Sequence, residues 1–286
     1  MEMSGPDSSA KSISAEVPYL RSELEQVFVE FTARILGDDT VERRAVQIRN
    51  GRTGAQPPSL EREGFQIARW PSRVVRERMD ELTAEKPPLQ MPQAYLDYWD
   101  DTIPLIQKLS HARDVVPVHA STVRYSPRAD KKKWMTPAGW AHLDYDPQEA
   151  EVQLKETLAL AGREVRPFSR YVLYQGWRVL SDPPQDFPLA ICDGRTVLAS
   201  DIIPIDYHMN SGGRDVNYRS RGSHYNAQHQ WWYFPDMTID EMLVFKGFDS
   251  ASADATNTLH VAFEDTTAEN PVPRASLETR YFALFD

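Results

Sequence analysis

The sequence predicts a mainly β fold with helices, in which a double-sheet jelly roll is buttressed by helices from the N-terminal part. From residue 115 onward, short runs rich in Val, Ile, Tyr, Trp and Phe are bounded by Gly, Pro, Asp or Ser. Before residue 115, amphipathic helical patterns predominate. The chain has 286 residues and no sign of an internal boundary, so one domain over residues 1–286 is expected.

The N-terminal part starts with small polar residues, which predict disorder over residues 1–16. Apolar residues between Leu20 and Ile35 recur at helical spacing, although their Val and Phe content also fits a strand. Three further segments are expected: an extended stretch over 64–72, a helix over 72–86 and a helix over 92–112 that Pro104 interrupts.

The C-terminal part contains eight predicted strands and one helix. The helix covers 147–162 and ends at Gly162, a residue typical of helix stops. The polar, glycine-containing stretch over 206–230 has few apolar anchors, so it is a candidate lid. The strands are predicted over 115–127, 139–146, 169–180, 188–200, 229–235, 242–249, 259–265 and 276–286.

The composition excludes several classes of function. Hydrophobic residues make up 41% and charged residues 26%, which is the ordinary globular range. The 32 basic and 42 acidic residues give a net charge of −10, which argues against nucleic-acid and anionic-membrane partners. Cys192 is the single cysteine and lies in an apolar run, so it is expected to be a core residue in a reducing compartment. We therefore expect a cytoplasmic protein, whose oligomeric state the sequence leaves open.

The sequence "AHLDYD" contains a candidate metal site. On a strand, His142 and Asp144 would point to the same face. Two histidines and one carboxylate suit non-haem Fe(II), because they leave coordination positions open for substrate and O2. His260 lies on a predicted strand far downstream and is the best third ligand, while His119 remains a weaker competitor. The other four histidines lie on a helix or in the polar stretch.

Arginines near the C-terminus offer a site for a dicarboxylate. Arg274 and Ser276 would share one strand face and present a planar fork and a hydroxyl, as the distal carboxylate of 2-oxoglutarate requires. Arg280 lies at an even offset from Arg274, so the sequence leaves open which arginine forms the ion pair. In "STVRYSP", Arg124 with the adjacent Tyr125 is a further candidate for cofactor binding. For Arg124, and for Arg178 in "GWRVL", a structural salt bridge is an equal alternative.

These motifs resemble a known group. "HLD", the distant histidine in "HVAFED" and "RAS" match the HxD…H…RxS order of Fe(II)/2-oxoglutarate-dependent dioxygenases. More specifically, the chain resembles the mainly fungal hydroxylase/desaturase family that includes gibberellin desaturase and a protein of cephamycin methoxylation. Matching stretches, among them "REGFQIARWPS" and "WWYFPDMTIDEMLVFKGFDS", span most of residues 45–286. The resemblance implies a double-stranded β-helix, iron, 2-oxoglutarate and O2.

Two functions are compatible with these observations. The first is a dioxygenase that hydroxylates or desaturates a small natural product and releases succinate and CO2. The alternative is a non-redox jelly-roll protein that binds a metal or another ligand. The pair of Arg274 and Ser276 favours the dioxygenase, because a non-redox site needs no clamp for a dicarboxylate. Neither the substrate nor the choice among hydroxylation, desaturation, cyclisation and epimerisation follows from the sequence.

Overall fold

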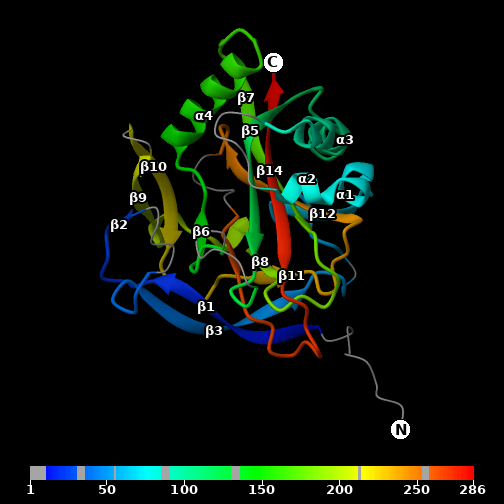
Figure 1. Cartoon of the computed structure of the whole chain (residues 1–286). Coiled ribbons are helices and arrows are strands. Elements are labelled where there is room, and N and C mark those ends of the chain that lie inside the picture. Colours follow the sequence, from blue (N-terminus) through cyan, green and yellow to red (C-terminus); the bar gives the residue numbers. More distant parts are fainter. Residues whose placement is uncertain are drawn as a thin grey trace.

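The described strands form two sheets, and helices cover the smaller one (Figure 1). The computed structural model describes residues 11–30, 36–54, 56–84, 91–129, 136–211, 214–252 and 258–286. Within these residues, the larger sheet has the strand order β1-β3-β11-β8-β13-β6-β10-β9-β2 and the smaller has β4-β12-β7-β14-β5. This arrangement confirms the predicted mainly β, jelly-roll class.

The elements have the following bounds. The larger sheet contains β1 (Ser12–Leu20), β2 (Val27–Glu30), β3 (Val41–Asn50), β6 (His142–Leu143), β8 (Leu189–Cys192), β9 (Ile202–Ser211), β10 (Arg214–Ser223), β11 (Trp231–Tyr233) and β13 (His260–Ala262). The smaller contains β4 (Phe65–Arg69), β5 (Asp114–Tyr125), β7 (Arg170–Val179), β12 (Glu241–Asp249) and β14 (Ala275–Phe285). The helices are α1 (Arg73–Glu77), α2 (Met79–Thr83), α3 (Gln93–Ser110) and α4 (Pro147–Leu160), with 3-10 turns at Gly194–Thr196 and Ala199–Asp201.

The helices α1, α2 and α3 pack on one face of the smaller sheet (Figure 1). Tyr95, Tyr98 and Trp99 of α3 are buried there, so this helix supplies much of the core on that side. The helix expected over 72–86 is two short helices that meet at Arg78, and its residues 85–86 lie outside the described part. No helix in the described part of the chain is long and apolar enough to cross a bilayer.

The N-terminal prediction was wrong from residue 12 onward. Residues 12–16, which we expected to be disordered, begin β1, and this strand pairs antiparallel with β3 along its whole length. Ile13 and Val17 are buried, at a spacing that places both on one face of the strand. Burial of that face outweighs the polar composition of the segment. Residues 1–10 lie outside the described part of the chain.

The helical spacing between Leu20 and Ile35 was also misleading. Leu20 ends β1, and Val27 and Val29 lie on β2, which pairs in parallel with β9. These three side chains form one buried cluster that also includes Ile203 and Ile205. The strand alternative, which the Val and Phe content indicated, is therefore the one that the fold uses. Residues 31–35 lie outside the described part.

Most of the predicted lid is formed by two strands, and two of the predicted strands are shorter than expected. Strands β9 and β10 form a regular antiparallel hairpin over most of residues 206–223. Whether this hairpin moves as a lid stays a prediction. The strand expected over 188–200 ends at Cys192 and continues as two 3-10 turns. The strand expected over 139–146 is reduced to the two residues of β6.

Arg178 has a structural role. Its side chain is fully buried on the helix-covered face of the smaller sheet. Its Nε donates to the Tyr98 hydroxyl at 2.9 Å, and its two terminal nitrogens donate to the carbonyl oxygens of Ile239 (2.5 Å) and Trp70 (2.9 Å). The charge is therefore satisfied by neutral acceptors rather than by the salt bridge we considered. Arg178 ties β7 to α3 and to the loop after β4.

Candidate metal centre

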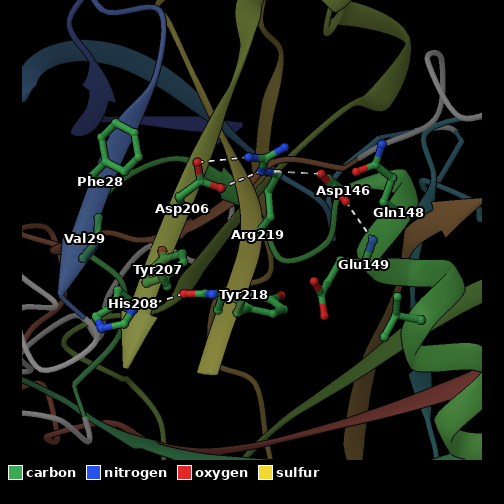
Figure 2. Close-up of a pocket in the computed structure, with 12 residues that line it drawn as sticks. Phe28, Val29, Asp146, Gln148, Glu149, Asp206, Tyr207, His208, Tyr218 and Arg219 are labelled. Carbon is green, nitrogen blue, oxygen red and sulfur yellow. Dashed lines mark hydrogen bonds and ion pairs between the residues drawn. The ribbon is translucent and has the colours of Figure 1, made fainter. Parts of the chain in front are cut away.

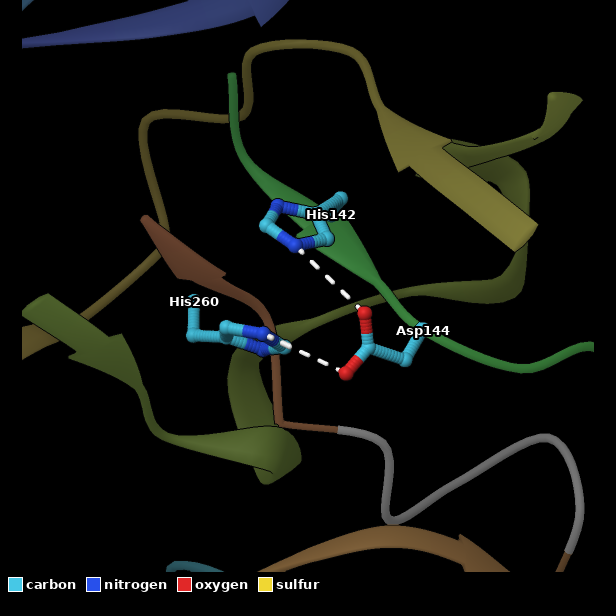
Figure 3. A group of neighbouring side chains, drawn as sticks. All are labelled: His142, Asp144 and His260. Atoms are coloured by element: carbon cyan, nitrogen blue, oxygen red, sulfur yellow. Dashed lines mark ion pairs between the residues drawn. The ribbon is translucent and has the colours of Figure 1, made fainter. Parts of the chain in front are cut away.

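Three side chains converge where the larger sheet faces its partner (Figure 3). His142 on β6 and His260 on β13 are directly paired across the two strands, and Asp144 follows β6 by one residue. His142 Nε2 lies 3.7 Å from Asp144 Oδ1, and His260 Nε2 lies 3.9 Å from Asp144 Oδ2. Within the described part of the chain, one potential ligand atom from each residue lies within 4.8 Å of the others. The strand pairing therefore brings together the three residues that the sequence singled out.

Hydrogen bonds orient the two imidazoles. His142 Nδ1 lies 2.8 Å from the Trp140 carbonyl oxygen and donates to it, which leaves the Nε2 lone pair facing Asp144. His260 Nδ1 makes a longer contact of 3.4 Å with the Thr258 carbonyl oxygen. Burial lowers the pKa of His142 to about 4 and also lowers the pKa of His260. Both rings are therefore neutral near pH 7, which is the form that binds metals.

Asp144 is ionised, and side chains of the smaller sheet donate hydrogen bonds to it. Burial alone would raise the pKa of its carboxyl, but Arg280 and the two histidines hold that pKa well below its usual range. Gln175 Nε2 on β7 donates to Asp144 Oδ2 at 2.5 Å, and Arg280 Nη2 on β14 donates to the same oxygen at 3.1 Å. The described residues thus supply two neutral imidazoles and one carboxylate, a donor set that fits Fe(II).

A cavity of about 560 Å³ adjoins the three side chains and lies between the two sheets. Charged side chains in its wall are two carboxylates and three guanidinium groups. The carboxylates can offset a divalent cation, and the guanidinium groups can offset an anionic ligand. The side chains that bear on the site are Arg124, His142, Asp144, Tyr145, Trp177, Tyr207, Tyr218, His260, Arg274, Glu278 and Arg280.

Arg274 is a fully buried cation whose side chain has two donors without a hydrogen-bond partner among the described residues, although the Asp186 carboxylate lies near enough to act on its charge. Its side chain is 1% exposed, and neither Nε nor Nη2 has a hydrogen-bond partner among the described residues. Burial lowers the pKa of Arg274 to about 10, so the guanidinium is still charged at pH 7. It lies 5.8 Å from the ring centre of Trp177, in the wall of the cavity. Buried donors without a partner are costly, so these two donors indicate a site for a carboxylate ligand.

The other predicted residues are divided between the cavity and the outside. Arg124 lines the cavity, whereas the structure does not bring Tyr125 to it, because adjacent residues on a strand face opposite sides. Tyr125 instead contacts Thr83 of α2. Ser276 is buried, and its hydroxyl lies 3.5 Å from the Arg124 carbonyl oxygen. His119 stacks on Trp99 at a ring separation of 5.1 Å and takes no part in the cluster.

Sequence inspection missed two residues of the site, Gln175 and Glu278. Glu278 lies 2.5 Å from Arg280 Nη2 and accepts a hydrogen bond from Gln175 Nε2 at 3.1 Å. Residues 274, 276, 278 and 280 alternate onto one face of β14, so the sequence could have indicated that Glu278 lies on the same side as the two arginines. Gln175 gave no such signal, because its place depends on the pairing of β7 with β14.

A larger cavity of about 710 Å³ lies outside the β9–β10 hairpin, facing α4 and β2 (Figure 2). The residues that line it include Phe28, Asp206 and Arg219. His142, Asp144 and His260 do not line it. Tyr207 and Tyr218 line both cavities, so these two side chains form the wall between them. The donor set, rather than the volume, places the candidate metal centre in the smaller cavity.

Comparisons with known proteins agree with this geometry. Hydroxylase/desaturase efuI of Hormonema carpetanum is 28% identical over 249 residues, which cover 80% of this chain and 79% of the relative. Fe(II)/2-oxoglutarate-dependent dioxygenase nvfI of Aspergillus novofumigatus is 28% identical over 187 residues, which cover 64% and 65%. A structure of a variant of the iron and alpha-ketoglutarate-dependent endoperoxidase NvfI superposes with a TM-score of 0.78, at 19% identity and 99% coverage of both chains.

The enzyme class follows from these relatives together with the donor set. The chain is a non-haem Fe(II)/2-oxoglutarate-dependent oxygenase whose cofactors and co-substrates are Fe(II), 2-oxoglutarate and O2. The non-redox alternative finds no support among the relatives. Residues 21–284 match the family described as "Oxidoreductase/YMDC permease-like domain". The chain resembles fungal hydroxylase/desaturases, and it belongs to this oxidoreductase family.

Proposed function

We propose that His142, Asp144 and His260 bind Fe(II), that Arg274 binds the distal carboxylate of 2-oxoglutarate, and that the enzyme oxidises a small natural product. The observation that carries this proposal is that a two-histidine, one-carboxylate cluster and a buried guanidinium with two unpartnered donors line one cavity. A metal alone would explain the cluster, but it would not explain Arg274. A dicarboxylate co-substrate explains both.

Fe(II), when bound, would supply the redox chemistry that couples oxidative decarboxylation of 2-oxoglutarate to oxidation of the substrate. The residues of the chain bind and orient the reactants. His142 presents Nε2 because its Nδ1 is held by the Trp140 carbonyl. Arg274 would pair with the distal carboxylate through its planar fork, and Ser276, two residues along β14, is our candidate for an additional hydroxyl donor.

The walls of the cavity favour an apolar or aromatic substrate. Tyr145 and Tyr218 contact each other edge to face at a ring separation of 6.0 Å, and Tyr207 lies 5.9 Å from Tyr218. These rings line the side of the cavity nearest the β9–β10 hairpin. They would shield the reacting carbon from water and position it by contact area. Several relatives are named as hydroxylase/desaturases, which agrees with oxidation at carbon.

Turnover of 2-oxoglutarate tests the proposal without knowledge of the substrate. The full chain is incubated with Fe(II) and 2-oxoglutarate in air, and succinate is measured over time. We expect slow succinate formation that requires both Fe(II) and O2 and that stops when Zn(II) replaces Fe(II), because Zn(II) has no redox chemistry. Protein that binds Fe(II) tightly, yet forms no succinate with or without extracts of natural products, would contradict the proposal.

A further inference from the structure

The two oxygens of Asp144 have different surroundings. Oδ2 accepts hydrogen bonds from Gln175 Nε2 at 2.5 Å and from Arg280 Nη2 at 3.1 Å. Oδ1 lies 3.7 Å from His142 Nε2 and Oδ2 lies 3.9 Å from His260 Nε2, so both oxygens border the space between the proposed ligands. Among the described residues, hydrogen-bond donors are given for Oδ2 and none for Oδ1. An sp² carboxylate oxygen has two lone pairs, so the two donors use the capacity of Oδ2. Oδ1 is left to face the metal.

The fold builds this arrangement into the smaller sheet. Gln175 on β7 and Arg280 on β14 are directly paired across their strands, so the two donors stand side by side beneath Asp144. Gln175 is 1% exposed, and Glu278 lies 2.5 Å from Arg280 Nη2. Glu278 thus offsets the charge of Arg280 and fixes its position, while its second contact to Gln175 ties the two donors together.

Gly247 makes room for the amide of Gln175. It lies in a β-bulge of β12, where the pairing with β7 shifts between Lys246 and Phe248. A Cβ at position 247 would lie 2.5 Å from Gln175 Oε1, which is closer than real Cβ atoms approach another atom. A side chain at this position would therefore displace the amide that donates to Asp144.

We propose that Gln175 and Arg280 are positioning residues, which hold Oδ2 of Asp144 so that the carboxylate binds the metal through Oδ1 alone. The inference rests on the proposed metal ligands. It also distinguishes the two arginines of β14. Arg274 has two unpartnered donors, Nε and Nη2, for a co-substrate, whereas Arg280 has one, Nε, and its Nη2 is shared by two carboxylates of the chain. A ligand held in one rotamer leaves the remaining metal positions free for co-substrate and O2.

Binding of Co(II) tests the proposal with a readout other than turnover. Co(II) is titrated into the full chain without 2-oxoglutarate, and affinity and visible absorption bands are recorded. We expect Gln175→Leu to weaken Co(II) binding by about 10- to 100-fold and to shift the bands, since losing the partner of a ligand typically costs this much. Gln153→Leu is the matched control, because Gln153 lines the same cavity from α4 and should keep both wild-type affinity and bands. Wild-type affinity and bands in Gln175→Leu would overturn the proposal.

Two further variants keep the test decisive if Gln175→Leu does not fold. Gly247→Ala displaces the Gln175 amide without removing it, so we expect weaker Co(II) binding and shifted bands there as well. Wild-type values in that variant would overturn the proposal. Arg280→Lys should weaken Co(II) binding, and an effect on 2-oxoglutarate alone would assign Arg280 to the co-substrate instead.

His142→Ala in the same titration tests the assignment of the metal ligands separately from the positioning role of Gln175 and Arg280. If its Co(II) binding equals that of the wild type, the proposed ligands are wrong and this inference falls with them. If only His142→Ala weakens binding, the ligands stand and the positioning role alone is rejected.

Discussion

Replacing His260 by alanine removes most of the Fe(II) and all 2-oxoglutarate turnover. The remaining pair of His142 and Asp144 holds a divalent ion weakly, because the variant lacks the third donor, which comes from the neighbouring strand β13. We expect Fe(II) affinity to fall by more than about 100-fold, beyond the roughly 10- to 100-fold typical of losing an outer partner of a ligand. Metal analysis of the purified variant and a succinate assay measure the two effects.

His119→Ala is the matched control for this substitution. His119 stacks on Trp99 beneath α3 and takes no part in the cluster, so the variant should keep its iron. Full iron content in His260→Ala, or iron lost only from His119→Ala, would show that the ligand set is wrong and would return His119 to the place of the third ligand.

Arg274→Lys raises the concentration of 2-oxoglutarate that the enzyme requires and leaves Fe(II) affinity nearly unchanged. A lysine keeps the charge, but it cannot form two parallel hydrogen bonds with a carboxylate. Losing one partner of a buried, charge-assisted pair costs about 2–5 kcal/mol of binding, which is about 30-fold or more in affinity. Binding of 2-oxoglutarate to Fe(II)-loaded protein without O2 measures the change directly.

Arg280→Lys should give the opposite pattern. Arg280 pairs with Asp144 and Glu278, so its replacement should disturb the metal more than the co-substrate. The comparison of the two variants decides which arginine is the clamp. If Arg280→Lys raises the 2-oxoglutarate requirement and Arg274→Lys behaves like the wild type, the assignment of the two residues is reversed.

The sequence predicted the three proposed metal ligands better than it predicted the residues around them. His142, Asp144 and His260 could be selected because their residue types and order limit the choice, and the strand pairing places them together. The roles of Arg274 and Arg280 could not be separated, because their offset puts both on the cavity side. Only the contacts of their side chains distinguish them: Arg280 Nη2 contacts Asp144 and Glu278, whereas Nε and Nη2 of Arg274 have no partner among the described residues.

The remaining errors also have physical causes. Gln175 was missed because its contact with Asp144 depends on the register between β7 and β14, which no local pattern encodes. Tyr125 was a candidate only through its neighbour Arg124, although alternation along a strand already argues that two adjacent residues cannot share a cavity. The strand at residues 12–16 was missed because its apolar residues are few. Its alternation of Ile13 and Val17 becomes meaningful only with β3 alongside.

Visible absorption without O2 tests most directly the claim that iron and 2-oxoglutarate meet in this cavity. Fe(II)-loaded protein is titrated with 2-oxoglutarate in the absence of O2, and the spectra of the wild type and of His142→Ala are compared. We predict a lilac charge-transfer band in the wild type, produced by chelation of the metal through the keto-acid end of 2-oxoglutarate, and no band in His142→Ala. A wild-type protein that binds Fe(II) tightly and shows no band at saturating 2-oxoglutarate would contradict the account.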